Sequence, residues 1–132
     1  FQEILIGGKT FSGLEKKKMT LEEIKKYPMI ALGRETVTYQ FYDRIYLEAG
    51  IDFLPDTEVA TADQILPLVK NELGLAFIPE QMAQDAISKK EVIEIPLKAE
   101  IPQRNICMIY DCQHPLNAAA GKLKKMMIET QK

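Results

Sequence analysis

The stretch "TADQILPLVKNELGLAFIP", residues 61–79, joins a helix to a buried strand. Gly74 is a typical helix stop, and the apolar run 75–78 that follows is typical of a buried strand. Pro67 is disfavoured inside a helix, so the helix either begins after Thr61 or has a distorted first turn. The apolar residues before Gly74 have helical spacing and predict the buried face: Ile65, Leu66, Leu68, Val69 and Leu73.

Strands and helices alternate along the rest of the chain. Short apolar runs predict strands at 2–8, 29–33, 56–60, 75–78, 91–97 and 104–111. Helical patterns lie at 20–26, 34–50, 61–73, 79–90 and 117–132. An alternation of this kind predicts an α/β fold, with a parallel or mixed sheet and helices on both faces.

Local signals define several helix ends and faces. Thr20 and Glu23 have the spacing of a capping box, and Asn117 is placed as the cap of the last helix. Gly50 is the expected stop of the helix at 34–50. In that helix an apolar residue recurs every four positions, which predicts a core-facing stripe broadened by two tyrosines: Val37, Phe41, Ile45 and Ala49, with Tyr42 and Tyr46.

Two strands lead directly into helix starts that consist of polar residues with small side chains. The strand at 29–33 is followed by Thr36 and Thr38, and the strand at 56–60 by Thr61. A helix start offers free N–H groups and the positive end of the helix dipole, so two starts at one sheet edge suit a carboxylate or another small anion. Each threonine alone can instead be a plain helix cap, which is worth about 1 kcal/mol.

Composition and charge exclude several classes of protein. The chain has 132 residues, enough for one domain, and a formal net charge of −2 with interspersed acids and lysines. A nucleic-acid surface would be strongly basic, so we expect none in this chain. No apolar run approaches the roughly 18 residues of a membrane span, so no membrane partner is expected.

The cysteines and the histidine indicate neither a disulfide nor a metal site. Cys107 and Cys112 lie five residues apart, which places them on opposite faces of a strand. We therefore expect reduced cysteines, with Cys107 as a small core residue. His114 has no second ligand at a recognised spacing, so a loop histidine is expected, without metal or other cofactor.

Three segments together resemble the effector-binding domain of LysR-type transcriptional regulators. They are "YPMIALGRETVTYQFYDRIYLEAGI" (27–51), "ATADQILPLVKNELGLAFIPEQMA" (60–83) and the closing "HPLNAAAGKLKKMMIE" (114–129). The resemblance implies a fold like the type 2 periplasmic binding proteins. It implies a second effector subdomain at 12–96 and a partial, incomplete first subdomain at 1–11 and 97–132.

The resemblance also implies a function. A cytoplasmic regulator of this family binds a small effector, often a carboxylate, between its two subdomains, and it is not an enzyme. The matching effector-binding positions are Thr36, Thr38, Thr61 and Ala62. DNA would be bound only through a winged helix-turn-helix that this chain lacks.

Self-association is a further implication of the resemblance. The family forms homodimers, and tetramers in the parent protein. We expect the strands at 2–6 and 104–110 and the last helix to expose apolar surface that drives association. Leu123, Met126 and Met127 are the last-helix residues expected to lack partners.

Two other functions remain open at this point. A solute-binding protein of a transporter shares the two-lobed architecture and would use the same crevice. A small α/β enzyme is a weaker alternative, because the strand–helix junctions offer only carboxylates, with no nucleophile–base spacing. We interpret those carboxylates as surface residues: Glu35, Asp56, Glu58 and Asp63.

Overall fold

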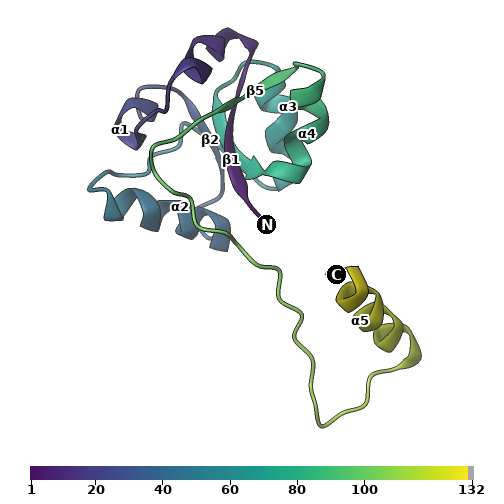
Figure 1. Cartoon of the computed structure of the whole chain (residues 1–132). Coiled ribbons are helices and arrows are strands. Elements are labelled where there is room, and N and C mark those ends of the chain that lie inside the picture. The colour runs from purple at the N-terminus through teal and green to yellow at the C-terminus, as the bar shows by residue number, and fades with distance from the viewer. Residues whose placement is uncertain (131–132) are drawn as a thin grey trace.

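The computed structural model describes residues 1–130, which contain one five-stranded sheet in the order β3-β2-β4-β1-β5 (Figure 1). The strands are β1 (Glu3–Gly8), β2 (Met29–Leu32), β3 (Thr57–Val59), β4 (Leu75–Pro79) and β5 (Val92–Ile95). β2 runs parallel to β3 and β4, whereas β1 runs antiparallel to β4 and β5. The sheet is therefore mixed, as the sequence pattern predicted.

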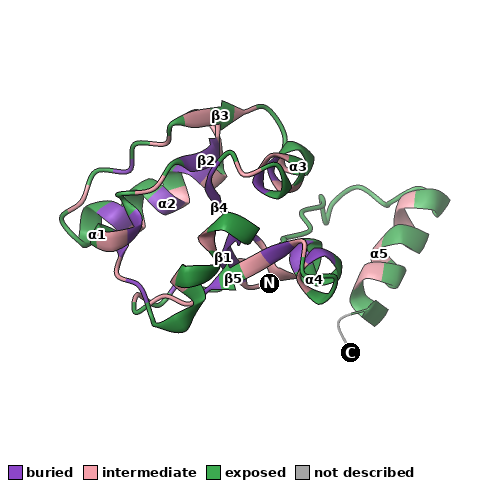
Figure 2. Cartoon of the chain, turned by 90° about the horizontal axis from the view of Figure 1, so that it is seen from above, coloured by how far each residue is buried: buried purple, intermediate pink, exposed green. Residues whose placement is uncertain are grey.

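Helices cover both faces of this sheet, which confirms the second part of the fold prediction (Figure 2). One face packs against α1 (Leu21–Ile24) and α2 (Val37–Glu48), and the other against α3 (Ile65–Lys70) and α4 (Glu80–Ser88). Alternating side chains of the central strands supply both cores. In β1, for example, Leu5 packs on the α2 face and Ile6 on the α3 face, and both are fully buried.

The buried face of α2 agrees with the predicted stripe only in part. Tyr42 and Tyr46 are buried as predicted, together with Tyr39, whereas Val37 is 76% exposed. The reason is the 3.6-residue period of the α-helix, because a strict four-residue repeat drifts around the helix surface. The tyrosines lie three and four residues apart, so they stay on one face, and Tyr42 stacks on Phe77 with ring centroids 4.4 Å apart.

Pro67 is accommodated because the helix begins late. Residues Ala62–Gln64 form a short 3-10 turn, η2, and α3 starts at Ile65. Pro67 is then the third residue of α3, where its missing N–H has no intrahelical partner to lose. Ile65 and Val69 are buried as expected, whereas Leu73 lies beyond the helix end and is 46% exposed.

The carboxyl-terminal part contradicts two predictions. Residues 104–111 are extended but belong to no strand of the described chain. Arg104 exchanges backbone hydrogen bonds with Phe1, and no described strand pairs with the residues after it. Cys107 is consequently exposed, so its prediction as a core residue is wrong. After this segment α5 (Ala118–Thr130) stands apart from the sheet (Figure 1). Its predicted cap is confirmed, since the Ala120 N–H donates to Asn117 Oδ1 at 2.8 Å.

The expected exposure of β1 is also wrong. β1 lies between β4 and β5, and all six of its residues are buried. The segment 104–110 and the last helix do expose apolar side chains, as predicted, and both are largely exposed in Figure 2. The division into subdomains at 1–11 and 97–132 and at 12–96 stays a prediction. Within residues 1–130, no helix is both long and apolar enough to span a membrane.

Candidate functional site

The carboxyl ends of two parallel strands define the candidate site. Leu32 at the end of β2 pairs with Val59 at the end of β3. The chain continues from each strand into a helical segment, α2 after β2 and η2 followed by α3 after β3. Both helical segments therefore begin at the same edge of the sheet, which is where ligands bind in open α/β sheets.

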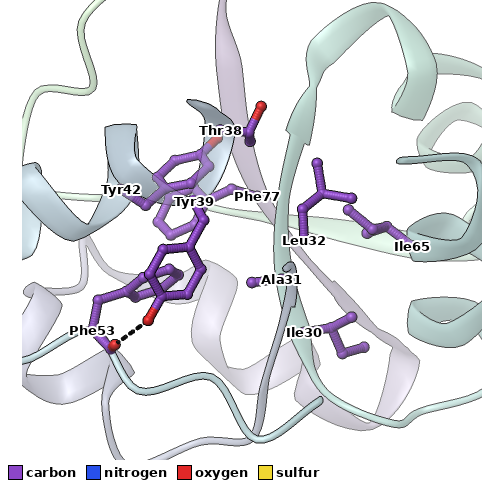
Figure 3. Close-up of a pocket in the computed structure, with 9 residues that line it drawn as sticks. All are labelled: Ile30, Ala31, Leu32, Thr38, Tyr39, Tyr42, Phe53, Ile65 and Phe77. Carbon is purple, nitrogen blue, oxygen red and sulfur yellow. Dashed lines mark hydrogen bonds between the residues drawn. The ribbon is translucent and has the colours of Figure 1, made fainter. Parts of the chain in front are cut away.

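A small cavity lies where α2, α3 and the sheet meet (Figure 3). Its volume of about 10 Å³ is room for one water molecule. Most of its walls are apolar, and the Thr38 side chain on the first turn of α2 is a polar exception (Figure 3). The lining residues are Ile30, Ala31, Leu32, Thr38, Tyr39, Tyr42, Phe53, Ile65 and Phe77.

Thr36 is used as a helix cap. Its hydroxyl donates to the Gly33 carbonyl at 2.7 Å and accepts from the Tyr39 N–H at 3.0 Å. This satisfies one of the N–H groups that the first turn of a helix leaves free, and the N–H groups of Val37 and Thr38 remain for a ligand or water. The backbone around Thr36, more than its hydroxyl, is thus available for binding.

Thr61 and Ala62 lie on the second helix start but do not line the cavity, which Ile65 reaches from the same segment. Thr61 is exposed and forms a capping box with Gln64, whose Oε1 accepts from the Thr61 N–H at 3.2 Å. Of the four predicted effector-binding residues, the structure therefore brings only Thr38 to the cavity wall. The role of all four in binding stays a prediction.

A largely buried polar cluster adjoins Thr38 and was not predicted from the sequence. Arg104 donates from Nη2 to Thr38 Oγ1 at 3.1 Å and from Nη1 to Glu3 Oε1 at 2.6 Å. The Tyr42 hydroxyl donates to the other oxygen of Glu3. Burial and the Glu3 charge raise the pKa of Tyr42, so its hydroxyl stays protonated and remains a donor. One signal was available, because an acid inside the apolar run 2–8 requires a buried partner.

Two of the acidic side chains named from the sequence have structural partners. Asp56 precedes β3, at the opposite edge of the sheet, and accepts from the Met29 N–H at 2.9 Å. Glu58 within β3 pairs with Arg34 at 3.4 Å, and Glu35 and Asp63 are exposed beside the two helix starts. Across residues 1–130 no group of three potential metal ligands comes together. Beside these carboxylates the edge presents hydroxyls, backbone N–H groups and an arginine, which are donors suited to binding an anion.

Comparison with known families identifies the class of domain. A family model described as the LysR substrate binding domain matches residues 10–132. The chain therefore belongs to the LysR substrate-binding domain family, and it is an effector-binding domain of a LysR-type regulator. Domains of this family are regulatory and not catalytic, so the chain is not an enzyme. No curated protein sequence matches the chain significantly.

Solved effector domains share the fold at low sequence identity. The regulatory domain of CcmR from Synechocystis PCC6803, in complex with 2-PG, is 10% identical, with a TM-score of 0.78 over 98% of this chain and 62% of that chain. The bromide ion-bound regulatory domain of HypT from Salmonella typhimurium is 13% identical, with a TM-score of 0.57 over 73% of this chain and 44% of that chain. The effector domain of AmpR from Pseudomonas aeruginosa is 13% identical, with a TM-score of 0.55 over 75% of this chain and 45% of that chain. The chain thus spans less than two thirds of each of these domains.

Proposed function

We propose that this chain forms one wall of an effector site that takes a small anion, such as a carboxylate. The site consists of the starts of α2 and of the η2–α3 segment, with Thr36, Thr38, Thr61 and Ala62 as its effector-binding residues. In the intact regulator, which acts in the cytoplasm, effector binding alters DNA binding by a winged helix-turn-helix outside this chain.

The observation that carries this proposal is the parallel pairing of β2 with β3, which brings both helix starts to one edge. An exposed helix end stabilises an anion by roughly 0.3–1 kcal/mol. Each hydrogen bond to a charged group adds about 1.5–3 kcal/mol. Two structural neighbours were solved with small ligands, one with bromide and one with 2-PG. This supports a site for small ligands in domains of this fold.

Titration of the chain with sodium acetate at constant ionic strength tests the proposal. We expect saturable amide NMR shifts centred on Val37 and Thr38, with a dissociation constant in the millimolar range at best, because few contacts offset the cost of ordering the anion. Thr38→Val removes the hydroxyl on the cavity wall and should weaken acetate binding about fivefold, whereas Thr36→Ser keeps the cap and should change it little. Shifts spread over the surface lysines without saturation would contradict the proposal.

A further inference from the structure

Arg104 is anchored where two segments of the chain lie side by side. Its backbone N–H donates to the Phe1 carbonyl at 3.0 Å, and the Phe1 nitrogen donates to the Arg104 carbonyl at 2.6 Å. Two residues that exchange both hydrogen bonds form the hydrogen-bonded pair of antiparallel chains. The Arg104 backbone is therefore held in place, and its side chain reaches the start of α2 from a fixed point.

The guanidinium group of Arg104 is held in a defined orientation. Its Nη1 and Nη2 atoms donate to Glu3 and Thr38, respectively, and its Cζ atom lies 5.0 Å from the Phe41 ring centroid and 5.5 Å from that of Phe1. The side chain is 19% exposed. A guanidinium has five N–H donors, and the bonds to Glu3 and Thr38 leave others to face a ligand.

We propose, on the basis of the proposed function, that Arg104 binds the anionic group of the effector beside Thr38. The planar guanidinium matches carboxylate and phosphate groups in a way that a point charge does not. Thr38 connects the two parts of the site, since its hydroxyl accepts from Arg104 and its side chain lines the cavity. The anion would then lie beside the contact between the first turn of α2 and the guanidinium.

Glu3 sets the strength of this site. Its side chain is 2% exposed, and its carboxylate orients Arg104 but also cancels the guanidinium charge. A bound anion is therefore attracted by Arg104 and repelled by Glu3 at close range. Replacing Glu3 by glutamine keeps an acceptor for Arg104 and removes the repulsion, so anion affinity should rise.

Arginine substitutions in the full chain test the assignment with acetate and inorganic phosphate as probes. We expect Arg104→Gln to weaken binding of both anions about tenfold or more, and Arg104→Lys about threefold, because lysine keeps the charge but loses the planar donors. Arg34→Gln is the matched control, since Arg34 is exposed at the same edge and pairs with Glu58. Its loss should change affinity by less than about twofold, as expected for a screened surface charge.

The Glu3 variants keep the test valid if Arg104→Gln alone unfolds the chain. Glu3→Gln should tighten acetate binding about threefold or more. The double variant Glu3→Gln/Arg104→Gln buries no unpaired charge, and it should no longer bind acetate. Folding is checked by the amide NMR spectrum of each variant. Wild-type affinity in the folded double variant would overturn the role of Arg104, with the effector site itself intact. Absence of saturable binding in the wild-type chain would overturn the proposed function and this assignment together.

Discussion

At the residue scale, the capping box of α1 shows how neighbouring groups set a pKa. The Thr20 N–H donates to the Glu23 carboxylate at 2.9 Å, and Lys17 Nζ lies 2.9 Å from its other oxygen. These hydrogen bonds favour the charged form and lower the pKa of Glu23 from 4.5 to about 2. The carboxylate therefore stabilises the folded state most where it is fully ionised.

The pH dependence of stability tests this bond network. Because the folded pKa of Glu23 is lowered to about 2, its contribution is present above pH 4.5 and is lost as the pH falls toward 2. Between pH 6 and pH 3, the free energy of unfolding should fall less for the Glu23→Gln variant than for the wild-type chain, as measured by urea unfolding. Glu22 is a neighbouring exposed residue, so Glu22→Gln is the control. Its free energy of unfolding should fall by as much as that of the wild-type chain over the same pH range.

Two tyrosines of α2 provide a second comparison of single groups. The Tyr46 hydroxyl is buried and has no hydrogen-bond partner in the described chain, whereas the Tyr39 hydroxyl donates to the Phe53 carbonyl at 3.1 Å. Tyr46→Phe should therefore leave the free energy of unfolding unchanged or raise it by up to about 1 kcal/mol. Tyr39→Phe should lower it by about 1 kcal/mol or more, because a buried carbonyl loses its donor. Equal losses in urea unfolding would contradict this account.

At the element scale, the junction between α3 and β4 depends on a close backbone approach at Gly74. A Cβ atom there would lie 2.6 Å from the Pro28 carbonyl oxygen, which also accepts from the Leu75 N–H at 2.8 Å. The chain from α3 can thus enter the sheet beside β2 only with a residue that lacks a side chain.

Gly74→Ala should lower the free energy of unfolding by about 2 kcal/mol or more, because the backbone at Pro28 must shift. Gly13→Ala is the control, since a Cβ atom at Gly13 meets nothing within 4 Å. Gly13→Ala should change the free energy of unfolding by no more than about 0.5 kcal/mol. A thermal melt in which both variants match the wild-type chain would rule out the close approach.

Local signals explain which elements were predictable. Thr20, Gly50 and Asn117 act on residues at most a few positions away, so sequence spacing alone identified the caps and the stop. The prediction of a strand at 104–111 was wrong because a strand needs a partner strand, and the presence of a partner is not a local property of the sequence. Arg104 was missed for a similar reason, since it lies 66 residues from Thr38 in the sequence.

At the scale of the whole molecule, the exposed apolar residues after the sheet predict self-association. Ile109 is 92% exposed, and Leu123 and Met126 on α5 are also exposed. Surface of this kind drives association, so we expect a dimer or a larger species in light scattering. Ile109→Glu with Leu123→Glu should shift the mass toward the monomer, and Val37→Glu, an exposed change on α2, should not. A clean wild-type monomer at high concentration would contradict this expectation.

The central position of β1 has a consequence during synthesis of the chain. β1 pairs with β4 and β5, and its first partner residues, Ala76 to Pro79, are made about seventy residues after it. At ribosomal rates of about 5–20 residues per second, the apolar segment "EILIGG" waits roughly 4–15 s for its first neighbour. During that interval it is an unpaired, aggregation-prone strand, which makes it a candidate for capture by a chaperone while translation continues.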